Sequence, residues 1–228
     1  MVTGELEQRF VQGLGGTSDK WRHYFEVYER HMARFKGKDC TYLEIGVQRG
    51  GSLTLMQEYL GAQAKVFGID IDPACANNPN HKVFIGDQSD AGFLSSVGDQ
   101  VGPLDIVIDD GGHTPDQQLV SFFTLFPRLK FGGVYIVEDL HCNYWEGYGA
   151  SRFGINFYDF AKGLTDKMAM WHFDRRMADG RAQQPREQRQ GTRSMGNFAA
   201  EQIFNISFYD SIIAFEKRLV PEPLRERR

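Results

Sequence analysis

Five short apolar runs, about 15 to 30 residues apart, constrain the fold of this chain more than any other feature. They are TYLEIGV at 41–47, KVFGIDI at 65–71, KVFIGD at 82–87, LDIVIDD at 104–110 and GGVYIVED at 132–139. Their β-branched and aromatic content is typical of buried strands. Because the intervals leave room for a helix between successive strands, they predict an α/β fold with a doubly wound parallel sheet.

The two ends of the chain depart from this rhythm. IFNISFYDSIIAFEK at 203–217 has two β-rich halves joined by a short turn around Asp210 and Ser211, which predicts an antiparallel hairpin at the end of the sheet. Residues 1–40 are predicted to be helical. A stripe of side chains recurs there at steps of three and four, and we interpret it as core packing: Trp21, Tyr24, Phe25, Tyr28, His31, Met32 and Phe35.

Composition excludes several classes of protein. The 228 residues carry a formal net charge of −4, which gives no electrostatic reason to expect nucleic acid as a partner. The three cysteines are far apart and form no CxxC pair, which argues against a disulfide framework and a thiolate zinc site. No stretch approaches the roughly 18 apolar residues of a membrane span, and the N-terminus lacks a signal sequence. We therefore expect a cytoplasmic protein without a membrane partner.

A glycine-containing loop follows the first predicted strand. In LEIGVQRGGS at 43–52, Glu44 ends the strand, Gly46 and Gly50 allow a tight turn, and the following helix, with Ser52 in its first turn, offers unpaired N–H groups to a ligand. The pattern is E-x-G-x-x-x-G rather than G-x-G-x-x-G, because residue 48 is glutamine. A dinucleotide pyrophosphate is therefore disfavoured.

Acidic residues also end the next two strands. Asp70 in FGIDID suits the two hydroxyls of a ribose, and Asp87 with Gln88 in IGDQSD suits an adenine edge. One such acid is a weak signal, but three in order at βα spacing are fairly specific for a nucleoside-containing ligand.

This order of motifs resembles the class I S-adenosylmethionine-dependent methyltransferases. The glycine loop resembles their first motif, Asp70 their ribose-binding acid and Asp87 their adenine-side acid. The resemblance implies a Rossmann-like, mostly parallel seven-stranded sheet with an antiparallel last strand, and S-adenosyl-L-methionine as cofactor. The cofactor-binding residues that we expect are Glu44, Gly46, Gly50, Ser52, Asp70, Asp87, Gln88 and Asp109.

The segment DIVIDDGGHTPDQQ at 105–118 ends the fourth strand with two carboxylates and a histidine. Thr114, Pro115 and Gln117 have the form of an N-cap, an N1 proline and a capping-box partner. A helix is therefore predicted to start directly after His113, which places this histidine at the rim of the sheet.

The fifth strand ends in Glu138 and Asp139, which should emerge beside Asp110 because adjacent parallel strands end at the same edge. Three carboxylates in one crevice repel one another unless a cation or protons intervene. All-oxygen ligation favours Mg²⁺ over zinc. The alternative is that these carboxylates only cap helices and accept backbone N–H groups.

These residues sharpen the resemblance to the metal-dependent sugar O-methyltransferases of natural-product biosynthesis, such as the mycinamicin and macrocin enzymes. It is carried by residues 108–145 and by GTSDKWRHYFEVYERH at 16–31. It implies methylation of a sugar hydroxyl on a small glycosylated substrate in antibiotic biosynthesis. Carried over by position, Asp110, Glu138 and Asp139 would hold Mg²⁺ and His113 would be the general base.

We expect one methyltransferase domain over 1–228. Its parts are an N-terminal helical segment at 1–40, a cofactor- and metal-binding core at 41–145, a lid or substrate insertion at 146–200, and a hairpin with a tail at 201–228. The arginine-rich stretch 172–196 has two interpretations, a solvated loop or a lid that meets a polar substrate. The acceptor and the oligomeric state, including a homo-oligomer, are left open.

Two other functions are compatible with the same residues. His113, His141 and a carboxylate could form the metal triad of a non-haem iron hydroxylase. A methyltransferase fold could also serve as a non-catalytic cofactor-binding module. His113 itself could be only a capping or core histidine.

Overall fold

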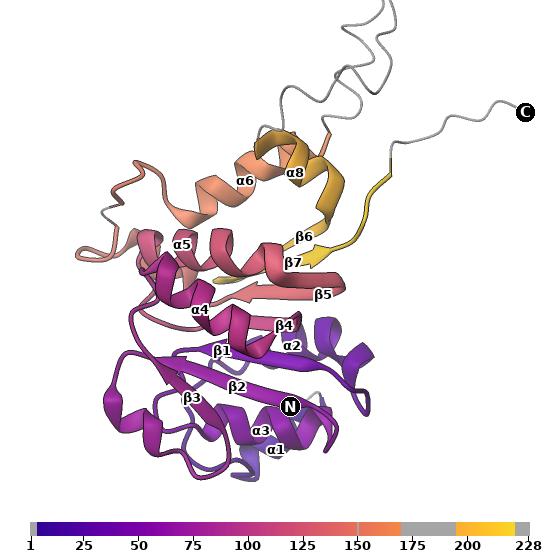
Figure 1. The fold of residues 1–228 in the computed structure, drawn as a ribbon, viewed down its shortest axis with the longest axis vertical. Helices are drawn as coiled ribbons and strands as arrows, with labels where there is room; N and C mark the ends of the chain where they lie inside the picture. The colour runs from indigo at the N-terminus through magenta and orange to yellow at the C-terminus, as the bar shows by residue number, and fades with distance from the viewer. Residues whose placement is uncertain (1–3, 150, 170–194, 222–228) are drawn as a thin grey trace, which may run out of the picture.

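A computed structural model of the chain describes residues 4–149, 151–169 and 195–221. These residues form one seven-stranded sheet with the order β3-β2-β1-β4-β5-β7-β6 (Figure 1). Strands β1 to β5 are parallel, and β7 is antiparallel to both β5 and β6. The predicted doubly wound α/β sheet and its antiparallel hairpin are confirmed. The strands are β1 Thr41–Ile45, β2 Lys65–Asp70, β3 Lys82–Ile85, β4 Leu104–Asp109, β5 Leu129–Val137, β6 Ile203–Tyr209 and β7 Ile212–Lys217.

Helices cover both faces of the sheet (Figure 1). One face carries α1 Glu5–Val11, α2 Tyr24–Met32 and α3 Gly51–Leu60. The other carries α4 Ala91–Val101, α5 Pro115–Leu125, α6 Phe157–Met168 and α8 Met195–Gln202. Short 3-10 turns are formed by Ala33–Phe35, Pro73–Asn77, Phe126–Arg128 and Leu140–Tyr144. None of the helices within the described ranges is both long enough and apolar enough to cross a membrane.

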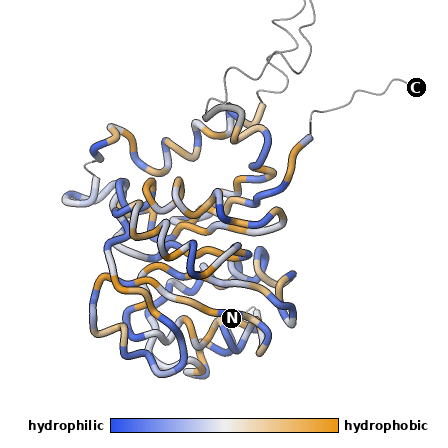
Figure 2. Tube along the Cα trace, in the orientation of Figure 1, coloured by the Kyte–Doolittle hydropathy of each residue, from blue (hydrophilic) through white to orange (hydrophobic). Residues whose placement is uncertain are grey.

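The alternation of side chains along each strand divides the interior into two apolar layers. On β4, Ile106 and Ile108 pack with α1, α2 and α3, whereas Val107 packs with the helices of the opposite face. Successive residues of a strand point to opposite faces, so a strand covered on both sides must be apolar throughout. Figure 2 shows hydrophobic colour along much of the central strands, interrupted at single polar residues.

The N-terminal region is less helical than predicted. Residues 12–23, between α1 and α2, form turns and irregular backbone, because Gly13, Gly15 and Gly16 adopt positive φ angles that end the first helix. Six members of the predicted stripe are buried, but Trp21 is 55% exposed. The prediction that Trp21 belongs to the core is therefore wrong, because it precedes α2, which carries five of the other six; Phe35 lies in the 3-10 turn that follows.

The chain order of the strands creates a crevice above the centre of the sheet. From β1 the chain moves outward through β2 to β3 and then returns to place β4 on the other side of β1. Ligands of open α/β sheets bind at such a switch point, outside the carboxyl ends of the strands. The predicted site residues follow these strands, so the topology brings them to one edge.

Candidate active site

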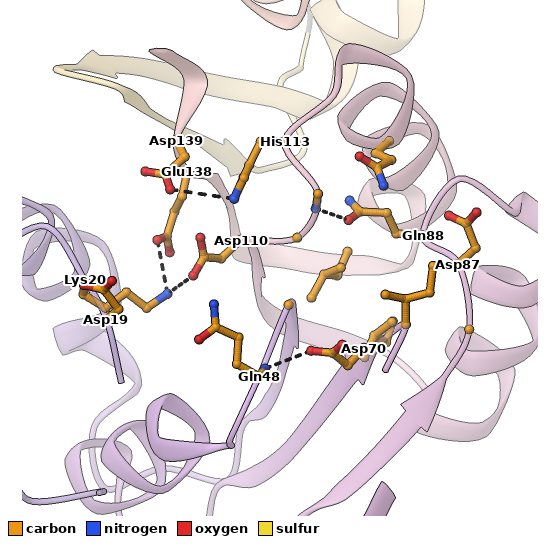
Figure 3. A pocket seen from close by; sticks show the side chains of 18 of the residues that line it. Asp19, Lys20, Gln48, Asp70, Asp87, Gln88, Asp110, His113, Glu138 and Asp139 are labelled. Atoms are coloured by element: carbon orange, nitrogen blue, oxygen red, sulfur yellow. Dashed lines mark hydrogen bonds and ion pairs between the residues drawn. The ribbon is translucent and has the colours of Figure 1, made fainter. Parts of the chain in front are cut away.

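A cavity of about 520 Å³ lies at this edge, and eight of the predicted site residues line it (Figure 3). They are Gly46, Asp70, Asp87, Gln88, Asp110, His113, Glu138 and Asp139. Four others do not line it. Glu44 and Asp109 are buried below the cavity, Gly50 precedes α3, and Ser52 is buried within that helix.

The glycine loop after β1 brings backbone close to backbone. Gly46 has φ +84°, and a β-carbon there would lie 2.0 Å from the carbonyl oxygen of Asp110. Only glycine fits this approach between the β1 and β4 loops. The backbone N–H of Gln48, two residues on, donates to Oδ2 of Asp70 at 2.8 Å, which links the loop to the end of β2.

Gln88 hydrogen-bonds to two residues at the end of β4 and in the loop that follows it. Its Nε2 donates to Oδ1 of Asp109 at 2.9 Å, and its Oε1 accepts from the backbone N–H of Gly112 at 2.8 Å (Figure 3). Burial raises the pKa of Asp109 to about 6. The Gln88 side chain is thus already bonded to Asp109 and to the loop after β4. Its predicted contact with adenine would have to compete with these two hydrogen bonds.

The β4 loop has the predicted capping structure. The Thr114 hydroxyl accepts from the Gln117 N–H at 3.4 Å, the Gln117 side chain accepts from the Thr114 N–H at 3.2 Å, and Pro115 opens α5. His113 directly precedes this cap and has φ +58°. The Asn143 side chain donates to the His113 carbonyl at 3.3 Å. The helix start thus holds the imidazole at the cavity.

Asp110, His113 and Asp139 form a compact group of candidate ligands. One ligand atom from each lies within 4.8 Å of the others. His113 Nε2 is 3.7 Å from Oδ2 of Asp139, whose other oxygen accepts from the Tyr24 hydroxyl at 2.7 Å. Tyr24 therefore orients the carboxylate toward the histidine.

Lys20 enters the same crevice from the irregular segment before α2 (Figure 3). Its Nζ lies 2.5 Å from Oδ2 of Asp110, 3.2 Å from Oε2 of Glu138 and 3.3 Å from Oε1 of Glu44. The lysine side chain is only 4% exposed. A buried ammonium ion thus contacts three carboxylates, one in β1 and one each directly after β4 and β5.

Burial and charge shift the titration of this cluster. Burial raises the pKa of Glu138 to about 7, although the Lys20 ammonium opposes this change. Burial and the Glu138 carboxylate raise the pKa of Asp110 well above its usual range. Burial lowers the pKa of His113, which favours the neutral imidazole, while the Asp139 carboxylate acts in the opposite direction. Three carboxylates hold the pKa of Lys20 well above its usual range despite burial, so this side chain is a cation.

Backbone strain is concentrated around the cavity. Among the described residues, the non-glycine positions with positive φ are Gln48, His113, Asp139 and Ser211. The first three line the cavity, and the Ser211 hydroxyl accepts from the backbone N–H of His141 beside it. Each such position costs of order 1–3 kcal/mol, so the surrounding structure must hold it in place.

The donor set suits a hard divalent cation. Asp110, Glu138 and Asp139 supply carboxylate oxygens, and the Glu138 side chain is only 1% exposed, with Lys20 and the Tyr28 hydroxyl beside it. Such a carboxylate is expensive to bury unless a cation or proton meets it. Mg²⁺ prefers oxygen ligands of this kind.

The two-histidine iron triad is not favoured by this geometry. Among the described residues, the group that could hold a metal ion contains His113 but not His141. The His141 ring instead packs against Trp145 and contacts the hydroxyl of Ser211.

Sequence reasoning missed Lys20, Trp21 and Tyr24, which also line the cavity. Lys20 lies 24 residues from Glu44 and 118 from Glu138, so no local spacing pairs these residues. The only signal was that all three fall within the segment 16–31 that resembles a family motif.

Residues 43–140, which run from within β1 to just past β5, match a family model described as a methyltransferase domain. Over these residues the chain is similar to methyltransferase domains. The matched range includes the glycine loop and the β4 and β5 ends but not Lys20, which precedes it.

Two curated relatives from Streptomyces olivaceus are similar to this chain. The 8-demethyl-8-alpha-L-rhamnosyl tetracenomycin-C 2'-O-methyltransferase is 37% identical over 204 residues, covering 81% of this chain and 52% of the relative. The 8-demethyl-8-(2-methoxy-alpha-L-rhamnosyl)-tetracenomycin-C 3'-O-methyltransferase is 34% identical over 215 residues, covering 88% and 51%. The chain therefore spans about half the length of the curated relatives it matches.

A solved structure has the same fold. MycE methyltransferase from the mycinamycin pathway, in complex with Mg, SAH and mycinamycin VI, superimposes with a TM-score of 0.71 at 26% identity. The match covers 94% of this chain and 53% of MycE. The resemblance to sugar O-methyltransferases of natural-product pathways is thus confirmed.

Proposed function

We propose that the domain transfers a methyl group from S-adenosyl-L-methionine to a sugar hydroxyl of a glycosylated natural product, with the help of Mg²⁺. The observation that carries this proposal is the convergence of Asp110, Glu138, Asp139 and His113 at the cavity of the glycine loop. The similarity to two rhamnosyl O-methyltransferases supports the substrate class.

The cofactor half of the cavity would be formed by the ends of β1, β2 and β3. Gly46 allows the ligand to approach the backbone, and Asp70 and Asp87 offer carboxylates to the ribose and to the adenine side. Both Asp70 oxygens already accept backbone N–H groups, from Gln48 and from Asp72, so this carboxylate is held in place before a ligand binds. S-adenosyl-L-methionine would supply the methyl group.

The reactive half would be formed by the ends of β4 and β5. Asp110, Glu138 and Asp139 would hold Mg²⁺, whose charge would lower the cost of removing the proton from the acceptor hydroxyl. His113 would accept that proton. Its neutral imidazole, favoured by burial, is the form that a general base requires.

The acceptor would enter past aromatic side chains at the mouth of the cavity. Trp21 lines the cavity and packs edge-on against His141, whose ring also packs against Trp145. Trp21 and Trp145 are both more than half exposed. Flat apolar rings beside carboxylates suit a sugar, which has apolar faces and polar edges.

The experiment that tests the proposed function is calorimetric titration of S-adenosylhomocysteine and of MgCl₂ into the wild type and the Asp110→Asn variant. We expect the wild type to bind both ligands. D110N should keep S-adenosylhomocysteine affinity within about threefold and lose at least tenfold in Mg²⁺ affinity, because a carboxylate ligand becomes an amide.

The matched control is Asp99→Asn, which changes an exposed aspartate on α4 that pairs with Arg128. It should bind both ligands like the wild type. A wild type that does not bind S-adenosylhomocysteine would end the methyltransferase proposal. Binding of both ligands without methyl transfer to any glycoside tested would favour the non-catalytic module instead.

A further inference from the structure

Lys20 is a buried charged residue of the cavity lining to which the proposed reaction assigns no role. Its Nζ lies within 3.3 Å of one oxygen of each of three carboxylates, Glu44, Asp110 and Glu138. We propose that Lys20 is a positioning residue, a built-in counter-cation that keeps the carboxylate crevice assembled and competes with the divalent ion for Asp110 and Glu138. This inference rests on the proposed function in that the ion is Mg²⁺.

Lys20 supplies the positive charge beside carboxylates that are buried. Glu44 and Glu138 side chains are each 1% exposed, and Lys20 is the cation that contacts both in the described structure. Buried carboxylates that lose their only counter-charge are strongly destabilising. Glu44 lies in β1, and Asp110 and Glu138 directly follow the neighbouring strands β4 and β5, so their mutual repulsion would act on the centre of the sheet.

Lys20 and the proposed Mg²⁺ would contact some of the same carboxylates. Two of the three, Asp110 and Glu138, are proposed Mg²⁺ ligands, whereas Glu44 lies outside the cavity lining. A divalent ion on Asp110 and Glu138 would therefore share carboxylates with an ammonium ion 2.5 and 3.2 Å from their oxygens. Because the two cations would share the same two carboxylates, they would repel each other across a short distance in a site of low effective dielectric constant. Lys20 should thus weaken Mg²⁺ binding while stabilising the protein without the ion.

Lys20 can act in this way because of where it sits in the chain. It belongs to the irregular segment between α1 and α2, so neither a helix nor a strand dictates its position. Its neighbour Arg22 pairs with the buried Glu7 at 2.7 Å, and Trp21 lines the cavity mouth. The charge contact therefore also fastens the segment that carries Trp21 to the reactive half of the site.

The test compares Lys20→Met with the wild type, because methionine keeps the length and removes the charge. In EDTA, K20M should lower the midpoint of thermal unfolding by about 5 °C or more. Saturating MgCl₂ should return most of that loss. Calorimetric titration should show that K20M binds Mg²⁺ at least tenfold more tightly than the wild type.

Lys65→Met is the matched control, since Lys65 is an exposed lysine that pairs with the exposed Asp39. It should match the wild type in both measurements. The double variant K20M/E138Q removes one of the uncompensated charges, so it should recover at least half of the midpoint lost in K20M. If K20M does not fold, folding of the double variant supports the proposal, and failure of both contradicts it.

Two results would overturn the role of Lys20 while the proposed function stands. One is a K20M midpoint in EDTA equal to that of K65M. The other is K20M binding Mg²⁺ no more tightly than a wild type that does bind it. A different result is that the wild type and K20M both bind S-adenosylhomocysteine but neither binds Mg²⁺. The reaction would then not use Mg²⁺, and Lys20 could not compete with it.

Discussion

His113 occupies a backbone conformation that residues other than glycine rarely adopt, with φ +58°. Two things hold it there, the capping box that starts α5 one residue later and the Asn143 side chain that donates to its carbonyl. The backbone that carries the imidazole is therefore fixed before any ligand binds. Such pre-organisation is expected of a group that must meet one particular proton.

Replacing His113 by glutamine should remove the base while keeping a polar side chain of similar size. We expect turnover to fall by about 10²-fold or more, with S-adenosylhomocysteine affinity within about threefold of the wild type. Steady-state assays with a rhamnosylated acceptor and calorimetry would measure the two effects. The control is His81→Gln, outside the cavity lining. Full turnover by H113Q would assign the base to another group.

Gly46 shows how one missing side chain shapes the cavity. Its replacement by alanine would place a β-carbon against the Asp110 carbonyl in an unfavourable φ region. We expect G46A to weaken S-adenosylhomocysteine binding at least tenfold and to lower the unfolding midpoint. Gly163→Ala on α6 is the control, because nothing lies within 4 Å of its added carbon and alanine favours helices. Equal cofactor affinity in G46A and the wild type would contradict this account.

At the scale of elements, α2 packs its aromatic face on the sheet and also carries a buried histidine. His31 Nε2 lies 2.9 Å from the Tyr209 hydroxyl on β6, and its Nδ1 is 3.4 Å from Glu216 on β7. The contact joins the N-terminal helix to the C-terminal hairpin. None of these three residues lines the cavity, so a change at His31 should affect the packing of α2 on the hairpin and not the site.

This contact predicts a pH dependence of stability. Burial, and then Arg34 and Arg30, lower the pKa of His31, while Glu216 raises it; the net shift is downward from 6.5. The unfolded chain therefore binds the proton at higher pH than the folded chain, and stability is lost as pH falls below about 6.5. His31→Gln should show a smaller loss of unfolding midpoint between pH 7.5 and 5.5 than the wild type. The exposed His23→Gln variant is the control, and an H31Q slope as steep as that of the wild type would contradict the prediction.

At the scale of the whole molecule, the cavity is built from five strand ends and the segment before α2, so a ligand there contacts most of the sheet. Ligands that bind only the folded state stabilise it by mass action. S-adenosylhomocysteine at 100 times its Kd should add about 2.7 kcal/mol, which raises the unfolding midpoint by roughly 5–10 °C for a chain of this size.

Thermal unfolding with increasing S-adenosylhomocysteine would measure this shift. The midpoint should rise with the logarithm of ligand concentration above Kd, and adenosine alone at the same concentration should produce a smaller rise. A midpoint that does not respond to S-adenosylhomocysteine would contradict binding at this cavity.

Much of this architecture follows from local sequence. The apolar runs predicted the five parallel strands, the turn at Asp210 and Ser211 predicted the hairpin, and Thr114, Pro115 and Gln117 predicted the start of α5. Each depends on residues close together in the chain, whose periodicity or capping chemistry acts locally. The stretch 172–194 of the predicted lid lies outside the described residues.

Tertiary structure decided which of the predicted polar residues face the cavity and which support it. Asp109 and Asp110 are neighbours in sequence, yet one binds Gln88 beneath the cavity and the other faces Lys20 within it, because successive side chains at a strand end point to opposite sides. The charge of Lys20 meets Glu44, Asp110 and Glu138 only because the sheet order places β1, β4 and β5 side by side. Sequence alone therefore determined the sheet, the glycine loop and the capped histidine, whereas the balance of charge in the crevice depended on contacts between distant segments.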